Sequence, residues 1–146
     1  MIAQTIESDH NAGQEVFAVV GNAAQPAWDE RTDEMRALAT LWDAHGTMLE
    51  RAVFPRLGDA SGALIEGLRS LQRQVEAMAA DLARRGPEHD ADGRWLADFE
   101  ELKRLFDAQC QRESAELVPF IRERAAPAEI AEMTRIARAL RQERAV

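Results

Sequence analysis

The sequence has no tyrosine, one cysteine (Cys110) and one lysine (Lys103) among its 146 residues. A single cysteine excludes an intramolecular disulfide and is typical of a reducing compartment. Aromatic residues make up only 5% of the chain, whereas Ala, Leu, Arg and Glu, which favour helices, are abundant. The composition therefore predicts an all-α fold.

Long apolar runs and basic patches are also missing. No apolar run approaches the roughly 20 residues that a transmembrane helix needs, and the N-terminus lacks the pattern of a signal peptide. The 26 acidic residues outnumber the 18 basic ones, for a net charge of −8, and no basic stretch with interleaved aromatics offsets this charge. We expect a cytoplasmic protein that binds neither membranes nor nucleic acid. A protein partner or a homodimer is left open.

The length of 146 residues is that of one domain, so we expect a single domain over residues 1–146. Apolar residues recur at helical spacing in four long segments. They predict helices over about 8–24, 32–55, 61–85 and 95–119. A further short helix is expected from Pro127, which suits a first helical position. This pattern predicts an antiparallel up-down four-helix bundle with a short additional C-terminal helix.

The second and fourth predicted helices repeat each other at a fixed offset, which aligns Met35 with Phe99 and Pro55 with Pro119. In the same alignment, His45 is equivalent to Gln109 and Leu49 is equivalent to Glu113. Such a repeat indicates a duplicated helix pair, with the first and third helices as the other members.

Four polar residues interrupt otherwise apolar helical stripes: His10, His45, Gln109 and Glu113. Their positions aim them at the bundle axis, where buried polar groups need partners. Two interpretations remain open. In the first, His45 and Glu113 form a hydrogen-bonded core pair together with Gln109. In the second, these residues belong to a metal site of the kind that helical bundles build in their cores.

Three segments carry a resemblance to a known family. His45 is followed by Gly-Thr-Met-Leu-Glu-Arg-Ala-Val-Phe-Pro-Arg-Leu, Gln109 is followed by Glu113 and Val118-Pro119, and Asp9 precedes His10. From about residue 6 to about residue 140 the chain resembles hemerythrin-like (HHE cation-binding) domains. The resemblance implies the same four-helix bundle and a helix that restarts after the last proline.

The resemblance also implies a metal site made of five histidines and two bridging carboxylates around two irons. Leu49 and Gln109 stand where the family has ligands, and the third helix offers no histidine. The residual family positions are His10, His45 and Glu113. We expect that the di-iron site is lost, that no metal is bound and that the role is regulatory, interactive or structural rather than catalytic. The alternative is one iron or zinc ion in a mononuclear 2-His-1-carboxylate site that senses or binds a small ligand such as O2 or NO.

The other candidates predict no chemistry. Glu50 lies about 100° around the helix from Leu49 and is expected to face solvent or a neighbouring helix. Cys110 is expected to be a half-buried, inert thiol, because no basic neighbour favours its thiolate. His89 is expected to be a solvated surface residue, and Trp28 and Trp95 are expected to cap the core.

Overall fold

The structure, a computed structural model, describes residues 1–21, 28–86 and 93–145. All regular elements in these ranges are helical, which confirms the all-α prediction. The α-helices are α1 (Ile2–Gly21), α2 (Trp28–Met48), α3 (Gly62–Arg85), α4 (Arg94–Arg112), α5 (Val118–Arg124) and α6 (Pro127–Ala145). Between them lie the π-helices η1 (Leu49–Val53) and η5 (Glu113–Leu117) and the 3₁₀-helices η2 (Phe54–Arg56) and η3 (Asp59–Ser61).

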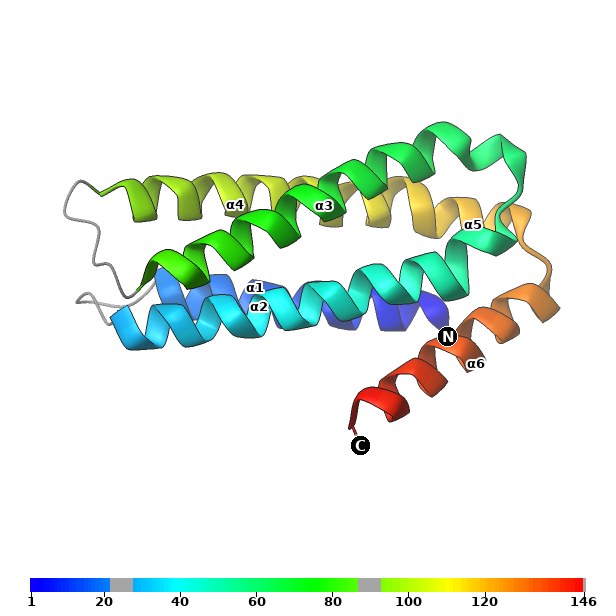
Figure 1. Ribbon diagram of the computed structural model, residues 1–146. Coiled ribbons are helices and arrows are strands. Elements are labelled where there is room, and N and C mark those ends of the chain that lie inside the picture. The colour runs from blue at the N-terminus through cyan, green and yellow to red at the C-terminus, as the bar shows by residue number, and fades with distance from the viewer. Residues whose placement is uncertain (22–27, 87–92, 146) are drawn as a thin grey trace.

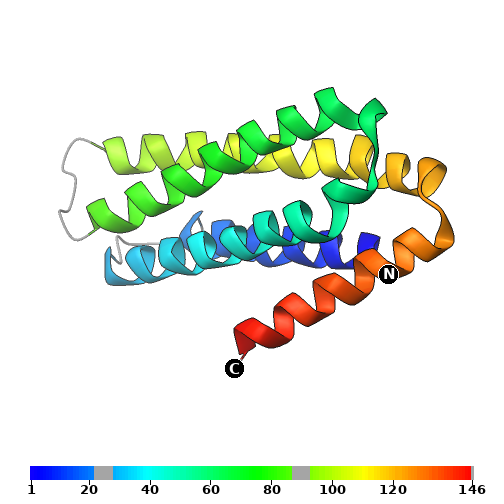
Figure 2. The same ribbon diagram turned by 45° about the vertical axis from the view of Figure 1, so that its right-hand side comes forward.

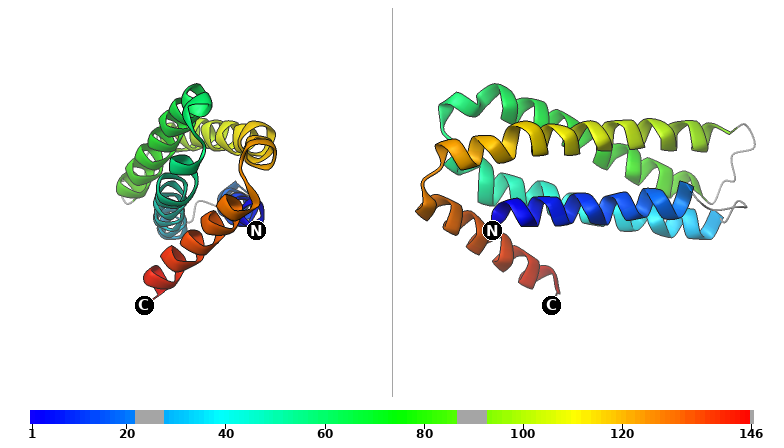
Figure 3. Two further views of the ribbon diagram at one scale, coloured as in Figure 1. Left: turned by 90° about the vertical axis from the view of Figure 1, so that its right-hand side faces the viewer. Right: turned by 180° about the vertical axis from the view of Figure 1, so that it is seen from behind.

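The helices α1 to α4 run alternately up and down and form the four corners of a bundle (Figures 1 and 2). Viewed along its axis, α6 lies outside the four corners and crosses the side formed by α1 and α2 (Figure 3). Over the described ranges, no helix is long and apolar enough to cross a membrane.

Several helix boundaries differ from the predicted ones. Helix α1 begins at Ile2 and α2 begins at Trp28, both earlier than predicted. The early start of α2 places Asp29 and Glu30 in its first turn, where carboxylates interact favourably with the helix dipole. Helix α6 spans 19 residues and is therefore not short. The predicted end of the first helix, at residues 22–24, lies outside the described residues.

The proline breaks occur where they were predicted. We call each of the four long helical segments of the bundle an arm. In the second arm, α2 is followed by η1 and η2, and Pro55 lies within η2. In the fourth arm, α4 gives way to η5, and Pro119 lies in the first turn of α5. A proline is tolerated there because the first turn of a helix has no intrahelical partner for its N–H. Pro119 therefore starts a new helical segment and does not end the arm.

The predicted repeat extends to the backbone. The two π-helices, Leu49–Val53 and Glu113–Leu117, occupy aligned positions of the repeat. The buried residues of α1 and α3 also align, with Ile6 opposite Leu68 and Val20 opposite Leu82. The two helix pairs thus share their core pattern and their backbone irregularities.

The core consists of two apolar clusters with a polar layer between them. One cluster lies toward the connections after α1 and α3 and includes Phe17, Trp42 and Phe106. The other lies toward the proline breaks and includes Leu49 and Leu117. Each of α1 to α4 has buried polar residues between these clusters: Asp9, His10, His45, Gln72 and Gln109, joined by Glu113 at the start of η5. Two further buried polar residues of α2, Arg31 and Thr32, lie near its start.

Candidate metal-ligand site

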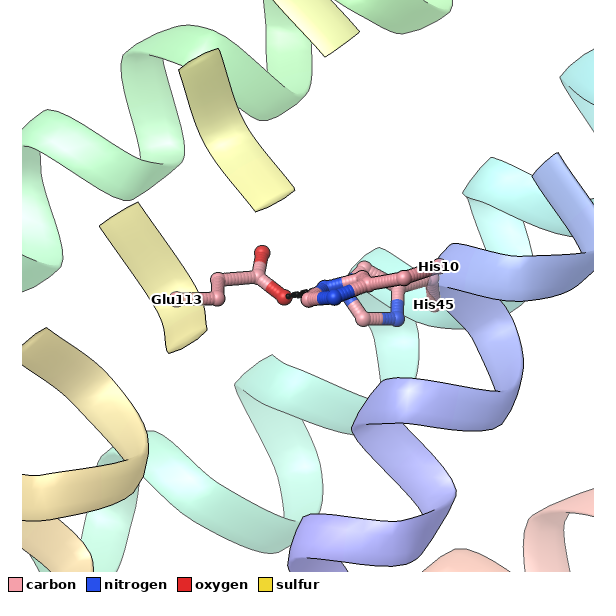
Figure 4. Close-up of side chains that lie close together, drawn as sticks. All are labelled: His10, His45 and Glu113. Atoms are coloured by element: carbon pink, nitrogen blue, oxygen red, sulfur yellow. Dashed lines mark hydrogen bonds and ion pairs between the residues drawn. The ribbon is translucent and has the colours of Figure 1, made fainter. Parts of the chain in front are cut away.

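Three side chains from three arms of the bundle converge in the polar layer. His10 comes from the middle of α1, His45 from the last turn of α2 and Glu113 from the first position of η5. The Nε2 atoms of both histidines lie 2.8 Å from Oε1 of Glu113 (Figure 4). The exposed fractions of the three residues are 5%, 0% and 0%. Their ligand atoms all lie within 4.8 Å of one another, so the cluster could hold a metal ion.

The short contacts determine the protonation of His45. Burial would raise the pKa of Glu113, but the charge of His45 and hydrogen bonds from both histidines outweigh it and lower the pKa to about 2. Burial also works against the charged form of Asp9, yet hydrogen bonds with His45 and Arg141 keep its pKa below the ordinary value. Since ionised carboxylates only accept hydrogen bonds, His45 donates from both ring nitrogens.

His45 is therefore an imidazolium between two carboxylates. Its Nδ1 lies 2.8 Å from Oδ2 of Asp9, and its Nε2 faces Glu113. Burial alone would lower the pKa of His45, but the charges and hydrogen bonds of Glu113 and Asp9 raise it to about 9. Asp9 thus fixes the proton on Nδ1 and leaves Nε2 as the nitrogen that points into the cluster.

Two glutamines occupy the other side of Glu113. Gln109 donates from Nε2 to Oε2 of Glu113 at 2.9 Å and to Oε1 of Gln72 at 2.7 Å. Oε1 of Gln109 accepts a hydrogen bond from Nε1 of Trp42 at 2.8 Å, and Nε2 of Gln72 donates to the carbonyl of Trp42 at 2.6 Å. The indole of Trp42 also stacks on the imidazole of His45, with 4.3 Å between the ring centroids. One hydrogen-bonded network therefore joins all four arms.

A glycine makes room for this network. A Cβ atom at Gly46 would lie 2.6 Å from Nε2 of Gln72, closer than a carbon atom can approach. The absence of a side chain at Gly46 lets Gln72 reach the backbone carbonyl of Trp42 on the neighbouring helix. The glycine at position 46 therefore allows α2 and α3 to be joined by this hydrogen bond.

The repeat gives the cluster a counterpart. The alignment of the second and fourth arms pairs His45 with Gln109 and Glu113 with Leu49. The alignment of α1 with α3 that pairs Ile6 with Leu68 also pairs His10 with Gln72. The two histidines and the glutamate thus have three aligned residues, two hydrogen-bonded glutamines and a buried leucine.

The structure brings together the four polar residues predicted to face the bundle axis, His10, His45, Gln109 and Glu113. The predicted contact of His45 with Glu113 is present, and Gln109 joins it as predicted. Sequence reasoning missed Gln72, because its neighbour Leu71 offers an apolar residue at a suitable spacing between Leu68 and Val75. It also missed the role of Asp9 and the contribution of α6. The one sequence feature that predicts a buried role for Gln72 is its equivalence to His10 in the repeat.

The remaining candidates lie away from the cluster. Glu50 is exposed and pairs with Arg69 of α3 at 2.6 Å, as expected for a residue that faces a neighbouring helix. Cys110 is fully rather than half buried, and burial raises the pKa of its thiol, which keeps the thiol protonated. Trp95 is buried and donates to the carbonyl of Leu82, as expected for a core residue. His89 lies outside the described residues, and the side chain of Trp28 is likewise not described.

Fold and site together define a class: a helical bundle with a buried cluster of histidine and carboxylate ligands between apolar layers. Comparison with protein families identifies that class more closely, because the hemerythrin HHE cation-binding domain matches residues 1–121. The chain belongs to this family. No curated protein and no solved structure matched the chain significantly.

Proposed function

We propose that the protein is a non-catalytic hemerythrin-like protein that binds one divalent metal ion, Fe(II) or Zn(II), through His10, His45 and Glu113. The observation that carries the proposal is the convergence of three ligand atoms within 4.8 Å in a buried layer. Two imidazoles and one carboxylate suit both ions. A bound ion would supply a Lewis-acidic centre with coordination positions left for water or a small ligand.

The surroundings of the ligands support this proposal. Ligating histidines usually donate their second N–H to a carboxylate, which fixes the tautomer, and Asp9 has this relation to His45. Ligating carboxylates are usually hydrogen-bonded as well, and Gln109 donates to the oxygen of Glu113 that faces away from the histidines. The cluster therefore has outer partners on two of its three ligands.

The same residues do not fit two ions. The whole sequence contains three histidines, fewer than the five that the family resemblance implies. The counterpart positions hold Gln72 and Gln109, whose amides bond to each other, and Leu49, which has no donor atom. Amides are poor ligands for oxidised iron, and leucine cannot coordinate. These residues support a site for a single ion. The aligned positions, which would hold a second ion, contain two glutamine amides and a leucine instead.

Burial limits what such a centre acts on. The three ligands are at most 5% exposed, so a large substrate does not reach them, whereas O2 or NO is small enough. A cavity of about 470 Å³ lies between α2 and α3, and both Leu49 and Gln72 line it. The burial of the ligands supports binding or sensing of a small molecule rather than catalysis on a large one. The single-domain organisation and the cytoplasmic location remain part of this proposal.

The test is metal stoichiometry. Protein stripped with a chelator and titrated with Zn(II), or with Fe(II) without oxygen, should bind one ion per chain by elemental analysis. Glu113→Gln and His45→Ala should abolish binding. Glu50→Gln is the matched control, because Glu50 is an exposed neighbour paired with Arg69, and it should bind like the wild type. Two ions per wild-type chain would refute the proposal.

A metal-free polar core that maintains the bundle for a structural or regulatory role is a second candidate. The observation that favours it is that the cluster's fully buried nitrogen and oxygen atoms all have hydrogen-bond partners. It requires that no divalent ion raises the melting temperature. It also requires that His45→Ala destabilises the metal-free protein by about 1–3 kcal/mol, through loss of partners for Glu113 and Asp9.

A further inference from the structure

Helix α6 reaches the polar layer through the side chain of Arg141. This helix lies beyond the part of the chain that the family match covers, residues 1–121. It is anchored by Met133 and Ala137, both buried, and crosses the side of the bundle formed by α1 and α2 (Figure 3). From its last turns, the half-exposed Arg141 donates to Oδ1 of Asp9, which is 3% exposed.

Arg141 completes a series of contacts from the surface to the ligands. Asp9 accepts from Arg141 at Oδ1 and from Nδ1 of His45 at Oδ2, and Nε2 of His45 faces Glu113. Across the described part of the chain, Asp9 makes no other side-chain hydrogen bond or ion pair. A buried carboxylate needs hydrogen-bond partners for its oxygens. The orientation of Asp9 therefore depends on Arg141 as well as on His45.

We propose that Arg141 is a positioning residue for the metal site, and that docking of α6 and binding of the ion strengthen each other. This inference rests on the proposed function. By holding Asp9 in place, Arg141 maintains the hydrogen bond between Asp9 and Nδ1 of His45 and so directs Nε2 toward His10 and Glu113. Because coupling between two sites is reciprocal, an ion that needs this orientation also stabilises the docked helix.

The first experiment measures Zn(II) affinity by competition with a chromophoric chelator. Asp9→Asn removes the direct partner of His45 and should weaken binding by about 10- to 100-fold. Arg141→Gln should weaken it several-fold, and Arg141→Lys should restore part of the loss. Arg141→Gln should have no further effect when Asp9→Asn is already present, since its effect passes through Asp9. Arg138→Gln is the matched control, because this exposed arginine of α6 makes no contact with charged partners among the described residues.

The second experiment uses metal-free protein, so that its result does not depend on the proposed function. In protein labelled with ¹⁵N-histidine, the Nδ1–H proton of His45 should exchange slowly with water. Arg141→Gln should speed this exchange and shift the signal, whereas Arg138→Gln should leave both unchanged. Circular dichroism verifies that each variant is folded.

The outcomes separate the two proposals. If wild-type protein binds no ion, the proposed function fails, together with the coupling to α6, and the exchange experiment alone decides the positioning of His45. If the ion binds but Arg141→Gln changes neither the affinity nor the exchange of Nδ1–H, the role of Arg141 is refuted. Unchanged hydrogen-exchange protection of α6 on addition of Zn(II) would refute the reciprocal coupling.

Discussion

At the scale of single residues, the two carboxylate oxygens of Glu113 have different hydrogen-bond partners. Its Oε1 atom faces the histidines, and its Oε2 atom accepts from the amide of Gln109. The positive charge of His45 stabilises the carboxylate in the absence of an ion. An incoming ion must displace the proton that His45 shares with Glu113. The same contact that stabilises the metal-free core would therefore compete with the proposed metal binding.

This competition predicts opposite effects of pH on the metal-free and the metal-bound protein. Folding raises the pKa of His45 from 6.5 to about 9, so its contribution to stability is complete below about pH 6.5 and is lost as the pH rises through 9. Metal affinity should instead rise by about tenfold per pH unit below 9, because one His45 proton is released. Thermal unfolding at pH 6, 7 and 8, with and without Zn(II), checks both trends. A melting-temperature gain from Zn(II) that shrinks as pH rises would contradict them.

The sequence predicted the residues of the buried polar cluster but only part of their surroundings. His10, His45, Gln109 and Glu113 could be found because each interrupts an apolar stripe. Gln72 could not be found in this way, because Leu71 lies beside it in the sequence. Leu71 follows the buried Leu68 by three positions and Gln72 follows it by four, and both spacings place a residue on the same face of a helix. The contact of Arg141 with Asp9 joins residues far apart in the chain, so no local pattern predicts it.

At the scale of elements, the polar layer depends on close packing beside it. Gly13 of α1 faces Phe106 of α4, and a Cβ atom at Gly13 would lie 2.3 Å from Cζ of Phe106. Phe106 also packs on Phe17 and Trp42, with ring centroids 5.0 and 4.6 Å apart. The absence of a side chain at Gly13 thus lets α1 and α4 approach on the side of the layer where Trp42 contacts Gln109.

The predicted effect of Gly13→Ala depends on Phe106. In the wild type the added methyl group should destabilise the protein by about 1–3 kcal/mol through overpacking. Phe106→Ala should cost about 3–5 kcal/mol. In that background Gly13→Ala should be neutral or stabilising by up to about 1 kcal/mol, because alanine favours helices and the clash is gone. Denaturant unfolding measures all four proteins.

Gly21→Ala, also in α1 but with no atom within 4 Å of the added Cβ, serves as the control and should change stability little. An equal cost of Gly13→Ala in both backgrounds would show that Phe106 does not cause the penalty.

At the scale of the whole molecule, the repeat was the most informative feature of the sequence. It predicted the pairing of the arms, and the aligned π-helices bear this out. The start of α1 was within reach of the pattern, because Ile2 is buried and continues the four-residue spacing of Ile6 and His10. The start of α2 was less predictable, because its first turn contains the acidic residues Asp29 and Glu30. The length of α6 was underestimated, because many of its residues are exposed and its contact with the bundle is confined to one side.

The repeat also predicts how a second ion could be accommodated. Gln72→His, Gln109→His and Leu49→Glu together would copy His10, His45 and Glu113 into their aligned positions. We expect this triple variant to bind one more ion per chain than the wild type, and to be less stable without metal because Leu49→Glu buries a charge. Elemental analysis and metal-dependent unfolding measure both effects. A variant that folds but binds no additional ion would show that the aligned positions are not equivalent in space.

The stacking of Trp42 on His45 gives the protein an internal optical probe. The indole lies 4.3 Å from the His45 ring, which is charged in the metal-free protein and would become neutral if its Nε2 held the proposed ion. A charged imidazole quenches indole fluorescence more strongly than a neutral one. Brightening of Trp42 would therefore follow occupancy of the centre in real time without any attached label, and would make the kinetics of ion entry accessible by stopped flow.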